Sequence, residues 1–306
     1  MAWSRTLVVS REETGKKFFL NRYLSLGHRL TGDERTPQAI RVNTLKTTDD
    51  EISATLTGLG VRLAKVPYLD HGYVVEESEF SLGASIEYLL GLYSLQESAS
   101  QYAAQTLAPN PGDTVLDMCA APGGKTTQIA AYMENRGLLC AMDVDRERVY
   151  ALENNLERCG VDNSFVYLGE AASLDLGTRF SKVLLDAPCS GNYVTDPSWF
   201  SRRDIEDVHR NAETQRKLLS AAVQNLEPGG TLLYSTCSLE PEENELNIVW
   251  LLSNHEVVLE EVDGPGEDGL TEVFGKELDD EISKCHRFWP DTTRTQGFFL
   301  AKVVKR

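Results

Sequence analysis

The chain has 306 residues, 41% of them apolar, so it is long enough for two folded domains, each with a core of its own. It has no run of about 18 apolar residues, and the residues after Met1 do not form a secretory signal, so we expect a cytoplasmic protein without a membrane span. The net charge of -17 argues against broad attachment to a polyanion, unless a local basic patch survives on an acidic surface.

The acidic residues are spread along the whole chain and do not form a tail. This distribution favours an adaptation of the entire surface, because carboxylate-rich surfaces stay solvated in concentrated salt. We therefore expect a halophilic protein, whose denaturation midpoint rises with salt concentration. Full stability in dilute buffer would contradict this expectation.

The first third of the chain predicts a helical extension followed by a small mixed domain. Residues 1–35 are expected to be helical, with an apolar cluster around Phe18 and Phe19. Residues 36–105 alternate between strand-like and helix-like patterns, which predicts an α+β domain. Its expected elements are strands at 41–45, 61–66 and 72–75 and a helix at 49–59.

Residues 106–306 predict a larger α/β domain. Apolar strands alternate with amphipathic helices, a pattern typical of a doubly wound, mostly parallel sheet. The expected strands lie at 114–118, 138–142, 165–168, 182–185 and 232–236, and the expected helices at 126–133, 146–159, 204–226 and 242–252. Residues 257–262 and 297–304 are expected to pair as a final antiparallel hairpin, separated by an acidic, glycine-rich insertion at 263–296.

A glycine-rich turn, DMCAAPGGKT at 117–126, follows the first strand of this sheet. Its ending is similar to a triphosphate-binding loop, but that motif requires glycine where Cys119 stands. The two glycines instead let the backbone approach a ligand at a helix N-terminus. Asp143 ends the second strand, where an acid can bond ribose hydroxyls, and Glu170 follows the third. The pattern fits a nucleoside, and it fits a dinucleotide less well because it is not G-x-G-x-x-G.

Two of the cysteines stand at positions that demand a chemical reason. The six cysteines are Cys119, Cys140, Cys159, Cys189, Cys237 and Cys285. None forms a C-x-x-C pair, so we expect reduced thiols and no metal site. Cys189, within DAPCSG, and Cys237, within STCS, follow the fourth and fifth strands, at the sheet edge where ligands bind.

Two thiols beside a nucleoside-type site indicate covalent catalysis on a pyrimidine ring. Carbon 5 of cytosine becomes nucleophilic when a thiolate adds to carbon 6, and it can then take a methyl group from a sulfonium. The sequence DAPC favours this carbon acceptor, since amine methylation is associated with a Pro-Pro-aromatic sequence at that position. Lys125 is the candidate for lowering the thiol pKa, and Asp186 for holding the base. Strand order alone does not decide which thiol attacks.

From about Arg41 to its C-terminus the chain resembles the NOP/Sun family of RNA cytosine-5 methyltransferases. The resemblance rests on the three motifs above and on RVNTL at 41–45, PEENE at 241–245 and GFF at 297–299. It implies a class I SAM-dependent methyltransferase fold with a Rossmann-like, mostly parallel seven-stranded sheet and an antiparallel C-terminal hairpin. It also implies that residues 36–105 bind RNA.

The resemblance assigns roles within the site. It implies that Cys237 attacks carbon 6, that Cys189 helps to resolve the covalent adduct, and that Lys125 and Asp186 approach the base. It also implies S-adenosyl-L-methionine as the cofactor. The residues implied to contact this cofactor are Cys119, Ala120, Ala121, Pro122, Gly123, Gly124, Lys125, Asp143, Glu170 and Asp186.

Three positions depart from the family pattern. Glu170 stands where aspartate is usual, although the longer acid still reaches a cofactor. Asp291 stands where histidine is frequent, and the loop 192–194 replaces a glycine-containing turn. We expect this loop to touch RNA.

Unstacked bases are held by aromatic and guanidinium planes, and the target base must leave its stack. The residues expected to contact RNA are therefore Arg41, Trp199, Arg202, Arg203 and His209. For the two neighbouring arginines, an ordinary solvated helix start is the alternative. We expect a haloarchaeal enzyme that acts on tRNA, with rRNA as the second choice and a catalytically silent RNA-binding or assembly factor as the alternative function.

Overall fold

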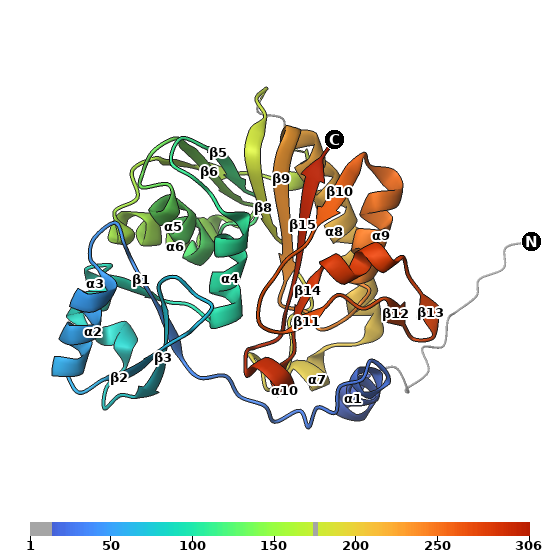
Figure 1. Ribbon diagram of the computed structural model, residues 1–306, viewed down its shortest axis with the longest axis horizontal. Coiled ribbons are helices and arrows are strands. Elements are labelled where there is room, and N and C mark those ends of the chain that lie inside the picture. The colour runs from blue at the N-terminus through green and yellow to red at the C-terminus, as the bar shows by residue number, and fades with distance from the viewer. Residues whose placement is uncertain (1–13, 174–176) are drawn as a thin grey trace, which may run out of the picture.

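The computed structural model describes residues 14–173 and 177–306. A small antiparallel sheet lies beside a larger mixed sheet that helices cover on both faces (Figure 1). Helix α1 (Gly15–Ser25) precedes both and lies on the side of the larger unit (Figure 1). The predicted N-terminal helical extension is wrong for residues 26–35, which follow α1 without helical structure. The part of this extension before Thr14 lies outside the described residues.

The small unit is a four-stranded antiparallel sheet in the order β2-β3-β1-β4. Its elements are β1 (Ala39–Val42), α2 (Asp49–Gly58), β2 (Arg62–Lys65), β3 (Gly72–Glu77), η1 (Leu82–Ala84), α3 (Ile86–Leu89) and β4 (Tyr93–Leu95). Thr48 and Glu51 form a capping box that starts α2, whose Ile52 and Leu56 are buried against the sheet. Strand β4 was not predicted, because its three residues are too few to show an alternating pattern.

The larger sheet has the order β11-β14-β15-β9-β8-β5-β6-β7, and β10 also pairs with β15. Its strands are β5 (Thr114–Asp117), β6 (Leu138–Asp143), β7 (Ser164–Leu168), β8 (Phe180–Asp186), β9 (Leu226–Thr236), β10 (Val257–Glu260), β11 (Glu267–Asp268), β14 (His286–Phe288) and β15 (Phe298–Lys305). The strands from β7 to β9 are parallel, whereas β15 runs antiparallel to β9. All seven predicted strands are present, so the expected α/β architecture is confirmed.

The predicted insertion between the last two strands contains more structure than expected. Strand β14 pairs with residues 298–300 of β15, and β10 pairs with residues 302–305, so both use the same edge of β15. The insertion also holds β11, the hairpin β12 (Glu272–Val273) with β13 (Lys276–Glu277), and η3 (Asp280–Lys284). These elements are too short for hydrophobic periodicity to reveal them.

Alternate residues of the central strands enter two different cores, because successive side chains of a strand point to opposite faces. Leu116 and Val183 pack against one face, under α8 (Ile205–Asn225) and α9 (Glu245–Asn254). Val115 and Leu184 pack against the other face, under α4 (Ser98–Leu107) and α5 (Gly124–Tyr132). A capping box of Asp204 with Asp207 starts the long helix α8. The helices of this unit are α4 (Ser98–Leu107), α5 (Gly124–Tyr132), α6 (Arg146–Cys159), α7 (Trp199–Arg202), α8 (Ile205–Asn225), α9 (Glu245–Asn254) and α10 (Pro290–Thr293), with η2 at Ala171–Ser173.

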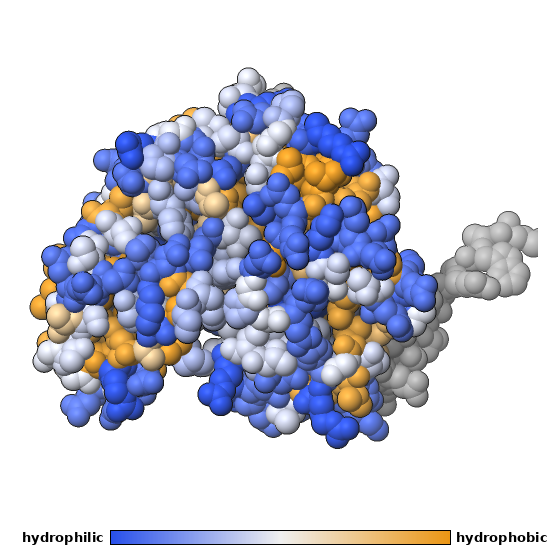
Figure 2. Space-filling view, viewed as in Figure 1, coloured by the Kyte–Doolittle hydropathy of each residue, from blue (hydrophilic) through white to orange (hydrophobic). Residues whose placement is uncertain are grey.

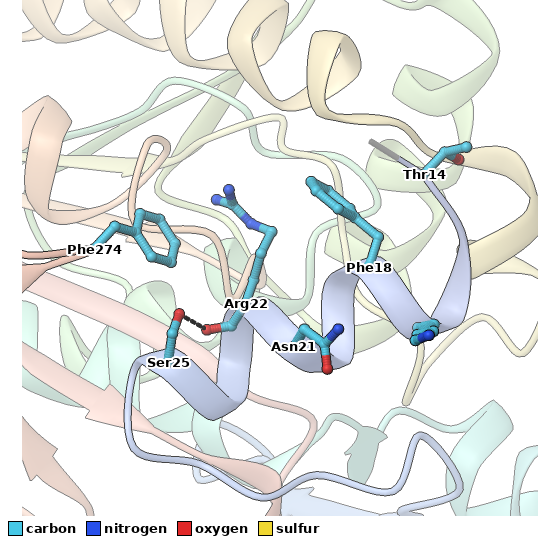
Figure 3. A pocket seen from close by; sticks show the side chains of 7 residues that line it. Thr14, Phe18, Asn21, Arg22, Ser25 and Phe274 are labelled. Carbon is cyan, nitrogen blue, oxygen red and sulfur yellow. Dashed lines mark hydrogen bonds between the residues drawn. The ribbon is translucent and has the colours of Figure 1, made fainter. Parts of the chain in front are cut away.

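Helix α1 is attached to the segment that follows β9. Arg22 donates to Glu240 (2.9 Å) and to Glu242 (2.7 Å), and the Tyr23 hydroxyl also donates to Glu240 (2.8 Å). The Arg22 guanidinium lies 4.4 Å from the ring centroid of Phe274, at the turn between β12 and β13. An open groove of about 560 Å³ lies along α1. Figure 3 shows Arg22 between the Phe18 and Phe274 rings that line it.

Arg41 joins the two units from inside. Its side chain is 2% exposed, and its guanidinium donates to the Gly124 carbonyl (2.7 Å), Thr127 Oγ1 (2.9 Å) and Gln96 Oε1 (2.9 Å). Gly124 and Thr127 belong to the first turns of α5, so a strand of the small sheet is bonded to the helix that follows the glycine-rich turn. Burial lowers the pKa of Arg41 to about 10.

We expect Arg41→Ala to lower the free energy of unfolding by about 2–4 kcal/mol, because it leaves buried acceptors without their donor. Denaturant titration measures this loss. Arg62→Ala is the control, since Arg62 forms an exposed ion pair with Glu76 (2.8 Å), and its removal should cost less than about 1 kcal/mol. Unchanged stability of Arg41→Ala together with weakened RNA binding would show that Arg41 contacts RNA directly.

Candidate active site

The carboxyl ends of the parallel strands open onto a cavity of about 530 Å³, a volume ordinary for small-molecule sites. The cavity brings together seven of the twelve residues predicted for catalysis and cofactor binding. Its lining includes Cys119, Ala121, Asp143, Glu170, Asp186, Cys189 and Cys237. A smaller cavity of about 230 Å³ adjoins it through Cys119, Ala121 and Asp186, and is lined by Lys125 and, from outside the sheet, by Leu95, Glu97 and Gln296.

The glycine-rich turn leads from β5 into α5 and forms the floor of both cavities. Gly123 has φ +104°, a left-handed conformation that favours glycine, and a side chain there would also meet Leu152 at 3.0 Å. The backbone N–H of Ala121 donates to Asp143 (3.2 Å), which ties the turn to the end of β6. Asp143 also accepts from Arg148 Nη1 (3.3 Å) while it lines the larger cavity.

A chain of hydrogen bonds fixes the carboxylate at the end of β8. Lys125 Nζ donates to Asp186 Oδ2 (2.8 Å), and Ser235 Oγ donates to Asp186 Oδ1 (2.8 Å). Lys125 is thus paired with Asp186, and its cation lies 5.3 Å from the Phe298 ring centroid. The pair presents an acceptor and a donor side by side, the arrangement that an amidine-like edge of a base requires.

The two thiols of the prediction are in contact. Cys189 Sγ lies 3.3 Å from Cys237 Sγ, although 48 residues separate them in sequence. The hydrogen bond with Cys237, together with burial and the nearby charge of Glu243, raises the pKa of the Cys189 thiol well above its ordinary value. The contact with Cys237, burial and the charge of Glu243 thus all disfavour the thiolate form of Cys189.

Cys119, the third thiol of the cavity, has a different environment. Burial, and next the charge of Asp117, raise the pKa of the Cys119 thiol far above its ordinary value. A thiol that stays protonated is a poor nucleophile, so the structure leaves Cys119 as a lining group of the cavity.

Glu170 and Val144 lie at the rim of the larger cavity. Glu170 follows β7 and is exposed, in the position that the prediction gave to a cofactor contact. Val144 follows Asp143 and is 70% exposed, although it is apolar. An exposed aliphatic side chain beside two carboxylates offers a flat apolar contact next to polar acceptors.

Two of the five expected RNA contacts are buried. Trp199 is 2% exposed, its Nε1 donates to the Ser190 carbonyl (2.7 Å), and its ring packs 4.5 Å from that of Phe19. Arg41 is enclosed between the two units, as described above. Neither side chain offers a plane to a base, so the structure gives both a supporting position in place of the expected RNA contact.

The other expected RNA contacts lie around the start of α8. Arg202 is exposed and pairs with Asp196 (3.2 Å), Arg203 is half-buried, and His209 is exposed. The surface view shows a notch at the lower rim, between the small sheet and the part that carries α10 (Figure 2). The face in this view is mostly hydrophilic.

The two remaining departures from the family pattern have structural partners. Asp291 accepts from His28 Nδ1 (3.2 Å), whose ring stacks on Trp289 at 3.9 Å. Loop 192–194 is buried, which contradicts its expected contact with RNA. Asn192 instead donates to the Cys237 carbonyl (2.6 Å), and the Tyr193 hydroxyl donates to Glu34 (2.8 Å).

Within residues 14–173 and 177–306, no group of three or more His, Cys, Asp or Glu side chains is arranged to hold a metal ion. No helix in the same residues is long and apolar enough to cross a membrane.

Comparison with known proteins identifies the family. Residues 104–304 match the model of the 16S rRNA methyltransferase RsmB/F family, and residues 27–98 match that of the N-terminal domain of 16S rRNA methyltransferase RsmF. The chain belongs to the RsmB/F methyltransferase family. Its relatives are RNA cytosine-5 methyltransferases, which confirms the predicted resemblance to the NOP/Sun family. A haloarchaeal origin stays a prediction.

Two relatives of this family differ in length. The chain is 38% identical to the 26S rRNA (cytosine-C(5))-methyltransferase nsun-1 of Caenorhabditis elegans, over 89% of this chain but only 43% of that protein. It is 37% identical to the tRNA (cytosine(49)-C(5))-methyltransferase of Pyrococcus abyssi, over 87% of this chain and 88% of that protein. The chain thus spans less than half of the nematode relative and nearly all of the archaeal one.

Solved structures agree with the family. A methyltransferase homolog protein from Pyrococcus horikoshii superimposes with a TM-score of 0.87 at 39% identity, covering 95% of both chains. NSun6 from the same organism, solved with SFG, superimposes with a TM-score of 0.79 at 28% identity, covering 90% of this chain and 92% of that one. The fold is that of class I SAM-dependent methyltransferases, as predicted.

Because the two sulfurs are 3.3 Å apart, we expect a mild thiol oxidant to join Cys189 and Cys237 in a disulfide. Alkylation of the denatured protein, read by peptide mass spectrometry, would then find both cysteines protected until a reductant is added. Cys140, buried in the core, is the internal control and should stay alkylatable. Oxidation that leaves Cys189 and Cys237 free would contradict the observed contact.

Proposed function

We propose that this protein transfers a methyl group from S-adenosyl-L-methionine to carbon 5 of a cytosine in RNA, through a covalent bond between Cys237 and carbon 6. The observation that carries this proposal is the contact of two thiols, 3.3 Å apart, in a cavity that also holds Asp186. Family membership supports the reaction type, since the relatives described above are named as cytosine-5 methyltransferases acting on rRNA and tRNA.

The covalent step assigns separate roles to the thiols. The Cys237 thiolate forms a bond with carbon 6, which makes carbon 5 nucleophilic. After methylation, a base removes the proton from carbon 5, the ring double bond returns, and the bond between Cys237 and carbon 6 breaks. Cys189 holds its proton beside Cys237, so it can donate to the departing sulfur and help to resolve the adduct.

Asp186 and Lys125 hold the target ring. Attack of the thiolate on carbon 6 sends electron density toward N3, which is neutralised when N3 carries a proton. Asp186 can accept hydrogen bonds from that N3–H and from the N4 amino group. Lys125 and Ser235, each 2.8 Å from this carboxylate, fix its orientation. Pre-set groups of this kind stabilise developing charge without reorganising during the reaction.

The cavity suits the proposed cofactor. When bound, S-adenosyl-L-methionine supplies an electrophilic methyl group on a sulfonium. Asp143 provides carboxylate oxygens for ribose hydroxyls, Glu170 provides an acceptor at the rim, and Val144 provides an apolar contact for a purine ring. The SAM analogue SFG in the Pyrococcus horikoshii NSun6 structure supports this assignment.

We infer that the RNA is tRNA. The tRNA enzyme of Pyrococcus abyssi matches this chain along nearly the full length of both proteins, whereas the nematode rRNA enzyme is more than twice as long. Methylation of rRNA is the second candidate, because the family model that matches residues 104–304 is described as an rRNA methyltransferase.

Transfer of a labelled methyl group to tRNA, assayed in high salt, tests the reaction and the two thiol roles. Cys237→Ala should lower turnover more than about 10³-fold and abolish the covalent RNA–protein adduct, because the nucleophile is absent. Cys189→Ala should instead let the adduct accumulate. The reverse pattern would exchange the roles of the two thiols.

Controls separate the alternatives. Cys140→Ala, which alters a core thiol outside the cavity, should retain methyl transfer. Preference for rRNA over tRNA, or for DNA over RNA, would change the proposed substrate. No transfer to any nucleic acid by the folded wild-type protein would support a silent binding factor.

A further inference from the structure

Glu243 lies where the two cysteine loops meet, yet no step of the proposed reaction uses it. Its side chain is completely buried, in the segment between β9 and α9. It accepts hydrogen bonds from the Ser190 hydroxyl, from the Ser190 backbone N–H (3.0 Å) and from the Ser238 hydroxyl (2.9 Å). Ser190 follows Cys189 directly, and Ser238 follows Cys237 directly. One carboxylate therefore bonds to the residue after each thiol.

Gln215 of α8 extends this contact to the other side of Cys189. Its Nε2 donates both to Glu243 Oε2 (2.7 Å) and to the carbonyl of Pro188 (2.9 Å). Its own Oε1 accepts from Asn247 Nδ2 (2.8 Å). The peptide groups before and after Cys189 are thus held from one buried network, Pro188 through Gln215 and Ser190 through Glu243.

The two serines also touch each other, since their hydroxyl oxygens are 3.1 Å apart. Glu243 accepts from both hydroxyls, so the oxygens are held at one carboxylate while the preceding sulfurs lie 3.3 Å apart. A shift of either serine would move its neighbouring sulfur. The spacing of the sulfurs is therefore tied to Glu243.

The charge of Glu243 is unusual among the buried acids of this segment. Glu240 is paired with Arg22, and Glu245 with Arg287 (2.5 Å). In the part of the chain that the structure describes, Glu243 forms no ion pair, and burial raises its pKa to about 7. Burying an unpaired carboxylate is costly, and an amide could fill the same space without that cost. The negative charge of Glu243 acts on Cys189, because it contributes to the raised pKa of that thiol.

We propose that Glu243 is a positioning residue that sets the spacing of the two thiols through Ser190 and Ser238 and places its carboxylate beside the Cys189 peptide. This inference rests on the proposed function for its effect on turnover. Its effects on thiol spacing and on the ionisation of Cys189 do not depend on that function.

Glu243→Gln tests the proposal, with Glu240→Gln as the matched control. Both side chains are completely buried in the same segment, but Glu240 bonds to Arg22 and Tyr23 of α1. For Glu243→Gln we expect a kcat about 100-fold lower, an almost unchanged KM for RNA, and a lower yield of the oxidative Cys189–Cys237 disulfide. Glu240→Gln is expected to lower stability and to leave all three unchanged.

The ionisation of Cys189 provides a readout that a purely structural role would not move. In a Cys237→Ser background, the pH midpoint of Cys189 alkylation should be displaced to lower pH by Glu243→Gln, because the nearby negative charge is removed. Glu240→Gln should leave this midpoint in place. A folded Glu243→Gln variant with wild-type kcat, disulfide yield and alkylation midpoint would overturn the proposal.

Two further variants keep the proposal testable if Glu243→Gln fails to fold. Ser190→Ala and Ser238→Ala each remove one hydroxyl donor to Glu243. Each should lower the disulfide yield, and each should lower kcat by less than 100-fold. In the double variant the two effects should not add, because both serines bond to the same carboxylate. Unchanged values in both would overturn the proposal. If the wild-type protein methylates no RNA, the proposed function fails, while disulfide yield and the alkylation midpoint still decide the role of Glu243.

Discussion

The parallel pairing of β8 with β9 is the constraint on which the site depends. Asp186 lies opposite Ser235 in this register, so β8 and β9 end at the same level along the edge of the sheet. Cys189 comes three residues after Asp186, and Cys237 two residues after Ser235, which places both thiols above one edge of the sheet. A slip of one residue would separate them and turn every side chain of the strand to the other face. The buried alternation of Val183, Leu184 and Leu185 between two cores prevents that slip.

Much of this arrangement could be predicted from the sequence, because long apolar strands and amphipathic helices leave strong periodic patterns. The helix at Arg146–Cys159 was predicted with its observed bounds, and the topology rule brought Cys189, Cys237 and Asp186 to one edge. The short elements could not be predicted, since three residues such as His286–Phe288 show no period. The choice of Cys237 as nucleophile came from family resemblance. The structure adds that the contact with Cys237, burial and the charge of Glu243 disfavour the thiolate form of Cys189.

The expected RNA contacts show where residue type misleads. Arginine and tryptophan are frequent in RNA interfaces, yet Arg41 and Trp199 are buried here as hydrogen-bond donors to carbonyl groups. The sequence did contain a sign that Trp199 is buried, because Trp199 stands next to another aromatic residue, Phe200. Both pack with the aromatic residues of α1. Glu243 is the opposite case, a residue whose place beside both thiols the sequence did not predict. It was noticed only as part of a motif, because nothing in a linear sequence reveals that one carboxylate will meet two serines 48 residues apart.

The shared edge of β15 has a consequence for how this fold can change in length. Strands β10 and β14 occupy successive parts of that edge, so the chain between them leaves the sheet and returns to it within a few residues of the same strand. Closing a longer loop between fixed ends is cheap, about 0.6 kcal/mol for each doubling. The stretch after Glu260 is therefore a place where evolution or an engineer can add a module without breaking a ladder, provided that the contact of Phe274 with Arg22 is kept. The loop that leaves this edge is thus a site that tolerates insertions, on the side of the molecule that carries α1.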